Sequence, residues 1–388
     1  MSSSPVRRRL RRVALAVAAL LALLVVGALV DGWVAFGRVA SGPRRARAEA
    51  SLHWARGHFE NPQPLVNDWW GTLKGAAAMS ADVSPKTPVP FEPVPRARFE
   101  VPPASGLRVT WLGHATSLVE VDGHRVLFDP VWSERASPLS FSGPRRWYRP
   151  PLALDDLPPL DAVVVSHDHY DHLDLPTVRA LDAKGVTFFV PLGVGAHLAY
   201  WGVEEARIVE LDWWESRAVG DLTITCTPAR HASGRTLLDK DEQLWAGWAL
   251  VGPSHRVYYS GDTGLFPAMK DIGARLGPFD VTLIEVGQYH SAWPDWHIGP
   301  EQAVTAHRWV NGRVLLPVHW GLFSLAYHAW TEPAERVLVA AQRAGVALAI
   351  PKPGQSVEPD ALPSLDRWWP ALAWQTADEA PIRSTGLP

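Results

Sequence analysis

The stretch from Ala162 to Leu173, AVVVSHDHYDHL, places a dense group of metal-binding side chains directly after a strand. Its first four residues are apolar and β-branched, which is typical of a buried strand. After Ser166 come, in order, His167, Asp168, His169, Tyr170, Asp171 and His172. Alternate residues of such a loop point the same way, so His167 and His169 can bind one ion, while Asp171 and His172 can reach a second. Because zinc prefers imidazole and carboxylate ligands in open hydrolytic sites, the spacing indicates metal-dependent hydrolysis rather than solvated surface histidines.

Three further candidate ligands each follow a predicted strand. His231 comes after Leu222 to Thr227, Asp262 after Arg256 to Tyr259, and His319 after Arg313 to Leu316. Taken singly, such residues are more often structural than catalytic. If the strand ends meet at one rim, however, loops on a rigid frame bring them to the histidine-rich loop.

Together these side chains predict a site for two zinc ions. We assign His167, His169 and His231 to one ion, and Asp171, His172 and His319 to the other. Asp262 is placed between them, because a carboxylate has two oxygens and can bridge cations about 3.5 to 4 Å apart. Two such ions activate water at neutral pH, so Asp262, with Asp171, is also predicted to orient that water and accept its proton.

The order of the predicted elements indicates an α/β (α+β) fold. Strands come first, over Leu107 to Val121 and His124 to Phe128, and strand–helix alternation follows. The later predicted strands are Val186 to Pro191, Ala206 to Leu211, Val281 to Glu285 and Ala347 to Ile350. The predicted helices are Asp174 to Gly185, Val194 to Trp201, Pro300 to Val310 and Glu332 to Ala344. Two mixed sheets packed face to face, with helices outside, would gather the ligands along one rim.

Bulk composition narrows the function classes. The net charge is −3, but five of the 37 basic residues lie in the first twelve positions, which contain no acid. The remainder carries 32 basic against 40 acidic residues, a net charge of −8. Such a body is a poor general binder of nucleic acid, whose affinity rests on neutralising phosphates. The single cysteine, Cys226, excludes an internal disulfide and leaves the redox compartment open.

An apolar segment near the N-terminus predicts a membrane anchor. Val13 to Val30 follows the arginine cluster and contains no charged or polar side chain. This apolar segment is long enough to cross a bilayer. A cleaved signal peptide is the rival interpretation, but its apolar part is usually shorter. A buried core helix is disfavoured by the flanking charges. Arginine counts on the two sides favour an N-terminus inside and a catalytic domain on the outer, extracytoplasmic face.

Composition divides the chain into five predicted parts. These are a basic N-terminus over 1–12, a transmembrane anchor over 13–36, a docked segment with a proline-rich connector over 37–105, a hydrolase domain over 106–356 and a tail over 357–388. The seven prolines between Ala81 and Pro103 exclude regular helix and central strand there. The twenty tryptophans fit both a large core and a membrane interface.

Beyond these residues, the sequence resembles the metallo-β-lactamase superfamily, and within it the N-acyl-phosphatidylethanolamine-hydrolysing phospholipase D group. The likeness runs from about Phe59 to about Pro353. It includes Thr110-Trp111-Leu112-Gly113-His114, the run His167 to His172 with Tyr170, Leu211-Asp212-Trp213-Trp214, Gly261-Asp262-Thr263-Gly264 and His319-Trp320-Gly321. The resemblance implies a four-layer αββα sandwich, the same seven zinc ligands, and a lipid phosphodiester as substrate.

Two more histidines are interpreted through this resemblance. His297 matches a family histidine beside the substrate phosphate, so it is a third predicted catalytic residue, steadying phosphoryl charge or protonating the leaving group. His114 is interpreted as a hydrogen-bond donor that shapes the rim, not as a ligand. Expected partners are a phospholipid or other ester, the membrane and, as an assembly to test, a homodimer.

Several alternatives remain open at this point. A lactonase, a thioesterase or a β-lactamase-like enzyme could use the same site, since one activated water serves esters, amides and phosphodiesters. A membrane-tethered binding protein with a dead site is the alternative from another class. A diiron oxidoreductase is disfavoured, because a carboxylate is expected where His169 stands.

Overall fold

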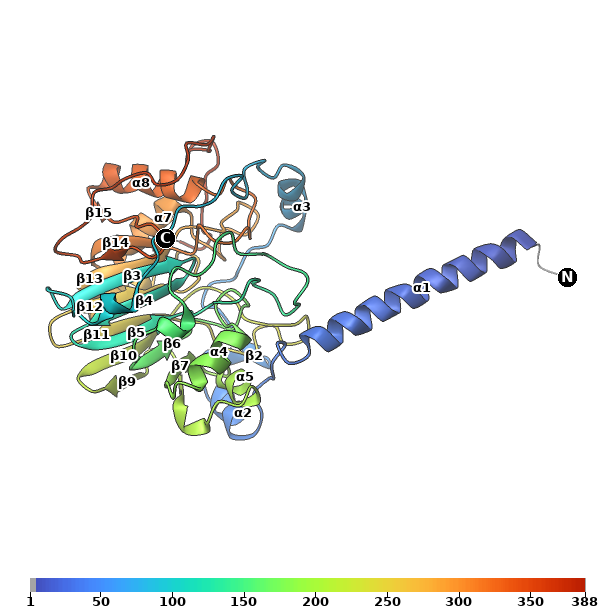
Figure 1. Cartoon of the computed structure of the whole chain (residues 1–388), viewed down its shortest axis with the longest axis horizontal. Helices are drawn as coiled ribbons and strands as arrows, with labels where there is room; N and C mark the ends of the chain where they lie inside the picture. Colours follow the sequence, from blue (N-terminus) through green and yellow to red (C-terminus); the bar gives the residue numbers. More distant parts are fainter. Residues whose placement is uncertain (1–4, 388) are drawn as a thin grey trace.

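The computed structural model of the chain describes residues 5–387, so residues 1–4 of the predicted basic N-terminus lie outside the described range. Two seven-stranded sheets are stacked, and a long N-terminal helix projects away from them (Figure 1). Helices cover the outer sides of both sheets. This is the predicted four-layer αββα sandwich.

The first sheet is antiparallel at one side and parallel at the other. Its spatial order is β16 (Ser356–Val357), β3 (Leu107–Gly113), β4 (Thr116–Val121), β5 (His124–Phe128), β6 (Ala162–Val164), β7 (Phe188–Pro191) and β8 (Ile208–Leu211). Side chains alternate across it: Val119 and Phe128 join the central core, while Leu118 and Leu127 join the outer apolar layer. That outer layer also contains residues of α4 (Leu175–Asp182) and α5 (Gly195–Tyr200).

The second sheet has the same mixed pattern. Its spatial order is β15 (Ala347–Leu348), β14 (Gly312–Val318), β13 (Phe279–Glu285), β12 (Arg256–Tyr259), β11 (Gly247–Val251), β10 (Leu222–Thr227) and β9 (Ser216–Val219). Strands β12 to β15 are parallel, so their carboxyl ends lie at one edge. The helices on this side are α6 (Met269–Leu276), α7 (Pro300–Trp309) and α8 (Glu332–Ala344), with α7 in contact with β13 and β14.

Local signals explain why the covering helices begin and end where they do. In α7 the proline at position 300 suits the first turn, and the Gln302 side chain accepts from the backbone N–H of Gly299. Helix α8 ends at Gly345, whose φ of 64° is left-handed. Both helices match their predictions closely. Strands β9 and β11 and helix α6 were not predicted.

The N-terminal apolar segment forms helix α1 (Pro5–Gly32). Within it, Arg9–Gly32 is long and apolar enough to cross a membrane; its apolar 18-residue stretch is unburied, whereas Gly32 at its end is buried. The helix ends at Gly32, so the last part of the predicted anchor, Trp33 to Phe36, forms turns instead. Figure 1 shows α1 running outward from the body, on the same side as α3 (Trp69–Ala77).

The segments flanking the sandwich pack onto it. The segment between α1 and β3 contains α2 (Gly42–Glu49), β1 (Trp54–Ala55), β2 (His58–Phe59) and α3, followed by a short 3-10 helix at Arg96–Phe99. Two further 3-10 helices, Leu154–Asp156 and Glu205–Arg207, lie between strands of the first sheet. The segment after β16 is irregular, yet Trp369 is buried in the core and Thr385 donates to Asp295. The domain boundaries named above stay a prediction.

Candidate metal centre

The strand ends meet at one edge of the sandwich, as predicted. The histidine-rich loop follows β6 in the first sheet, whereas His231, Asp262 and His319 follow β10, β12 and β14 in the second. Each of the seven predicted ligands belongs to a group whose ligand atoms lie within 4.8 Å of one another. Residues separated by up to 152 positions in the sequence therefore converge on one small volume, since His167 and His319 bound the set.

The first histidine trio is formed by His167, His169 and His231. The Nδ1 atom of His169 lies 2.8 Å from Nε2 of His167 and 3.3 Å from Nε2 of His231. His231 donates its Nδ1–H to the carbonyl of Trp296 at 2.9 Å, so its Nε2 carries a lone pair. The three ring nitrogens therefore point at one another, and a cation placed between them would be bound by all three.

Asp129 fixes the outward-facing ring nitrogen of His172 directly and that of His167 through Ser166. Its carboxylate accepts from the Ser166 hydroxyl at 2.5 Å and from Nδ1–H of His172 at 2.6 Å. Because that hydroxyl donates its hydrogen to Asp129, its oxygen accepts from Nδ1–H of His167 at 2.9 Å. In both rings Nε2 is consequently the nitrogen that faces the cluster and is available to a metal.

Asp262 lies between two groups of ligands. Its Oδ2 atom is 3.1 Å from Nε2 of His172 and 3.2 Å from Nε2 of His319. The same oxygen is 3.7 and 3.8 Å from two Nε2 atoms of the first histidine trio. Asp171 completes the second group, with Oδ2 at 3.3 Å from the same nitrogen of His172 and of His319. Asp262 is therefore placed to bridge two cations, through one oxygen rather than through the two that the sequence argument used.

The electrostatics of the cluster favour a positive charge inside it. Burial alone would lower the pKa of His319, but Asp262, Asp171 and Glu285 outweigh it and raise that pKa to about 10. Burial alone would likewise raise the pKa of the Asp262 carboxyl, yet the neighbouring His172 and His319 hold it well below its usual range. The field that stabilises protons here also stabilises a bound cation.

Unpaired polar atoms at the same place fit a metal. Within residues 5–387, His172 Nε2 and Asp262 Oδ1 are buried and have no hydrogen-bond partner. Buried polar groups are costly when unpaired, so such atoms in a side chain only 3% exposed need a ligand. Their chemistry, imidazole nitrogen and carboxylate oxygen, suits a metal of the zinc type.

Three residues support the ligands without being among the seven. Glu285 and Asp129 are not identified from the sequence, and His114 is predicted only as a hydrogen-bond donor. Glu285 is fully buried; its Oε2 accepts from His297 at 2.8 Å, and its Oε1 accepts from the backbone of Thr263. His114 donates Nε2–H to Asp171 at 2.8 Å, which agrees with its predicted role as a donor. Glu285, like Asp129, is an acid at the end of an apolar strand. The signal that marks Asp262, an acid at a strand end, marks both of them in the sequence.

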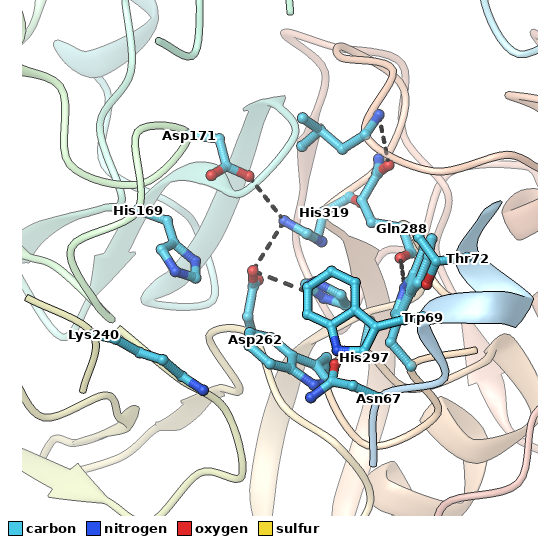
Figure 2. A pocket seen from close by; sticks show the side chains of 13 residues that line it. Asn67, Trp69, Thr72, His169, Asp171, Lys240, Asp262, Gln288, His297 and His319 are labelled. Carbon is cyan, nitrogen blue, oxygen red and sulfur yellow. Dashed lines mark hydrogen bonds and ion pairs between the residues drawn. The ribbon is translucent and has the colours of Figure 1, made fainter. Parts of the chain in front are cut away.

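His297 lies beside the cluster. Its ring is stacked on His319, with centroids 5.2 Å apart, and its Nδ1 is 3.8 Å from Asp262 Oδ2. Both rings line a cavity of about 460 Å³, with His169, Asp171 and Asp262 also in its wall. Figure 2 shows Lys240 on one side of Asp262 and Trp69 on the other. The cluster is therefore open to a substrate that enters this cavity.

Comparisons with known proteins establish the family. The family model described as a beta-lactamase superfamily domain matches residues 124–320, half of the chain. Igni18, a metallo hydrolase from Ignicoccus hospitalis, has the same fold with a TM-score of 0.50 at 24% identity, covering 65% of this chain and 97% of that one. The chain belongs to the metallo-β-lactamase superfamily and is a metal-dependent hydrolase of that superfamily.

Relatives place it more narrowly. N-acyl-phosphatidylethanolamine-hydrolyzing phospholipase D 1 of Caenorhabditis elegans is 42% identical over 246 residues, which cover 60% of this chain and 69% of that enzyme. An uncharacterised protein of Mycobacterium tuberculosis is 53% identical over 286 residues, or 72% of this chain and 77% of that protein. The resemblance to the phospholipase group is thus confirmed.

Proposed function

We propose that this protein is a membrane-anchored, zinc-dependent phosphodiesterase of the phospholipase D type that cleaves N-acyl-phosphatidylethanolamine-like phospholipids. The observation that carries the proposal is the cluster of seven ligands at the base of a cavity whose other walls include Trp69, Trp293, Trp296 and Leu325. A polar reacting centre below apolar walls suits a molecule with a phosphate and long acyl chains. The similarity to the nematode phospholipase supports the same substrate class.

The side chains divide the chemistry among them. Two zinc ions held by the seven ligands would polarise a phosphoryl oxygen and lower the pKa of water toward 7. The unpaired Oδ1 of Asp262 can orient the attacking water and accept its proton, with Asp171 beside it. Attack on phosphorus breaks the bond to the N-acylethanolamine oxygen, which then takes up a proton. Glu285 accepts from Nδ1–H of His297, so the Nε2 atom of that ring is free to contact phosphoryl charge or the leaving oxygen.

Exposed apolar side chains around the cavity favour a lipid surface as the source of substrate. Leu237 and Leu238 are 100% and 94% exposed, three and two residues before Lys240 in the cavity wall. Leu238 also lines a surface hollow together with Trp33, where α1 joins the body. Trp69, across the cavity, is 79% exposed. With α1 in the bilayer, these side chains would touch its surface, and the catalytic domain would lie on the outer face with the N-terminus inside.

The second candidate is another hydrolase activity on the same scaffold, such as that of a lactonase or thioesterase. The metal cluster serves those reactions equally well. The acidic body argues against nucleic acid as substrate. A catalytically dead binding protein conflicts with a complete ligand set, and homodimer formation awaits a measurement of mass in solution.

The deciding experiment compares substrates on one preparation. Purified full-length protein is analysed for bound metal and assayed on N-acyl-phosphatidylethanolamine, phosphatidylcholine, a thioester and a lactone. We expect about two zinc ions per chain and preferential release of phosphatidic acid from the first lipid. Turnover of only the lactone or the thioester would overturn the phospholipase assignment, and protein without metal would overturn the whole proposal.

A further inference from the structure

The juxtamembrane segment, residues 33–38, joins α1 to the body through backbone hydrogen bonds to three buried side chains. Trp201 donates its indole N–H to the carbonyl of Val34 at 2.8 Å. Arg235 donates Nε–H to the carbonyl of Ala35 at 2.8 Å. The backbone N–H of Arg38 donates to Nδ1 of His197 at 3.0 Å. Three anchoring bonds within five residues, Val34 to Arg38, are more than a flexible linker needs.

His197 connects this segment to the metal-binding loop. Because its Nδ1 accepts from Arg38, its proton must be on Nε2, and that atom lies 3.2 Å from the Asp168 carboxylate. Asp168 is fully buried and stands between the predicted ligands His167 and His169. The backbone of the juxtamembrane segment therefore selects the tautomer that fixes the loop.

Arg235 makes a second connection. Its Nη1 donates to the carbonyls of Asp168 and Leu173, the latter at 3.0 Å. Its guanidinium lies 4.0 Å from the centre of the Tyr170 ring, and the Tyr170 hydroxyl donates to the Arg235 carbonyl at 2.6 Å. The arginine is 4% exposed. The planar guanidinium group, with its hydrogen bonds to two carbonyls and its contact with the Tyr170 ring, fixes the backbone on both sides of His169.

Gly37 shows how closely the two parts approach. Its φ is +75°, and a Cβ atom added there would lie 2.1 Å from Nδ1 of His197. Such a contact is impossible without moving the histidine. Gly42, five residues further on, also has a positive φ, +55°, but a Cβ atom there meets nothing within 4 Å. The two glycines thus form a matched pair.

We infer that His197 and Arg235 are positioning residues for the histidine-rich loop, and that the juxtamembrane segment holds them in place. The membrane tether and one half of the metal site are then a single structural unit. This inference rests on the proposed metal site. Hydrogen-bond partners behind metal ligands typically change metal affinity by roughly 10- to 100-fold when they are lost.

The test compares Gly37→Ala with Gly42→Ala in the full-length protein. Both changes introduce a left-handed alanine, but only the first displaces His197. Metal affinity is measured by competition with a chelator, and the geometry of the site by the visible spectrum of the cobalt-substituted protein. We expect Gly37→Ala to weaken binding of one metal per chain by roughly 10- to 100-fold and to alter the spectrum. Gly42→Ala should match the unchanged protein.

A second pair keeps the test decisive if Gly37→Ala does not fold. His197→Gln retains an acceptor for Arg38 and a donor for Asp168, whereas His197→Leu retains neither. We expect wild-type metal retention for the first and loss for the second. Equal metal affinity and equal cobalt spectra in either pair would overturn the inference. Absence of metal from the unchanged protein would instead defeat the proposed function.

Discussion

The metal cluster and helix α1 differ in what holds them in place. Around the cluster, the ring nitrogens of His172, His167 and His231 that face away from the centre are bonded to Asp129, Ser166 and a backbone carbonyl, respectively, and Asp262 is 3% exposed. These bonds within the protein fix the orientation of the three rings. The apolar side chains of α1, in contrast, face solvent: from Val13 to Val30 none is buried against the rest of the chain.

The difference shows which parts of the molecule the chain can specify alone. A buried polar network is stable only when its members are paired, so its position follows from the packing of the two sheets. An uncovered apolar helix is stable only in an apolar surrounding, so its position follows from the bilayer. The juxtamembrane segment connects the part positioned by protein packing to the part positioned by the bilayer.

Asp262→Asn should break the cluster side of this comparison most severely. The amide keeps the shape of the carboxylate but removes the negative charge that faces both groups of ligands. We expect kcat/KM to fall by at least about 1000-fold, the scale of losing one electrostatic group at developing charge. Kinetics on the best substrate measure this change. Asp360→Asn, at an exposed carboxylate bonded to Arg313, is the control and should leave kcat/KM unchanged; an active Asp262→Asn enzyme would contradict the bridging role.

Two tryptophans sharpen the comparison in terms of stability. Trp320 is 1% exposed and packs on the rings of Trp111, Trp368 and Trp369, whereas Trp69 stands in solvent. We expect Trp320→Ala to lower the free energy of unfolding by about 3–5 kcal/mol, because a large cavity remains. Trp69→Ala should change it by no more than about 0.5 kcal/mol. Urea denaturation of both variants gives the two values, and similar losses would show that Trp69 is packed.

The candidate ligands could be found from the sequence because each follows a recognisable strand. His167 and His319 follow short apolar runs, His231 lies four residues after β10, and strands that point the same way bring such ends to one edge. What could not be found is the partner of each ring. Asp129 becomes the acceptor for His172 only when β5 and β6 lie side by side, which no local pattern encodes.

The irregular segments were the least predictable. Strand β11 is apolar on both faces, so it lacks the alternation that marks a half-buried strand. The segment after Val357 has no periodicity, yet its Thr385 side chain and backbone bond to Asp295 beside the cavity. Its order comes from tertiary contacts, and sequence reasoning that relies on periodicity does not detect those. His297 was placed by resemblance, and its catalytic role stays a prediction.

Metal binding should be linked to protons in a direction that the cluster fixes. Without metal the pKa of His319 is about 10, so the ring carries its extra proton at pH 7. A metal needs that lone pair, and its binding must displace the proton. Titration of the metal-free protein with zinc should therefore release protons at pH 7, and affinity should fall as pH falls. Calorimetry in two buffers of different ionisation enthalpy measures the release, and equal heats in both would contradict it.

The smallest expected effect concerns the contact between the lipid surface and the exposed leucines Leu237 and Leu238. Cys226 is buried and is the chain's one cysteine, so a cysteine introduced at an exposed position can be labelled selectively. An environment-sensitive fluorophore on Leu238→Cys should shift to shorter wavelength in proteoliposomes and be quenched by spin-labelled lipid, because this tip lies beside the end of α1. The same label on Val101→Cys should report water, since Val101 is exposed. Its carbonyl accepts from Arg108, which lies at the opposite end of β3 from His114 and the metal cluster. Identical aqueous spectra at both positions would mean that the cavity opens away from the bilayer, even if α1 spans it.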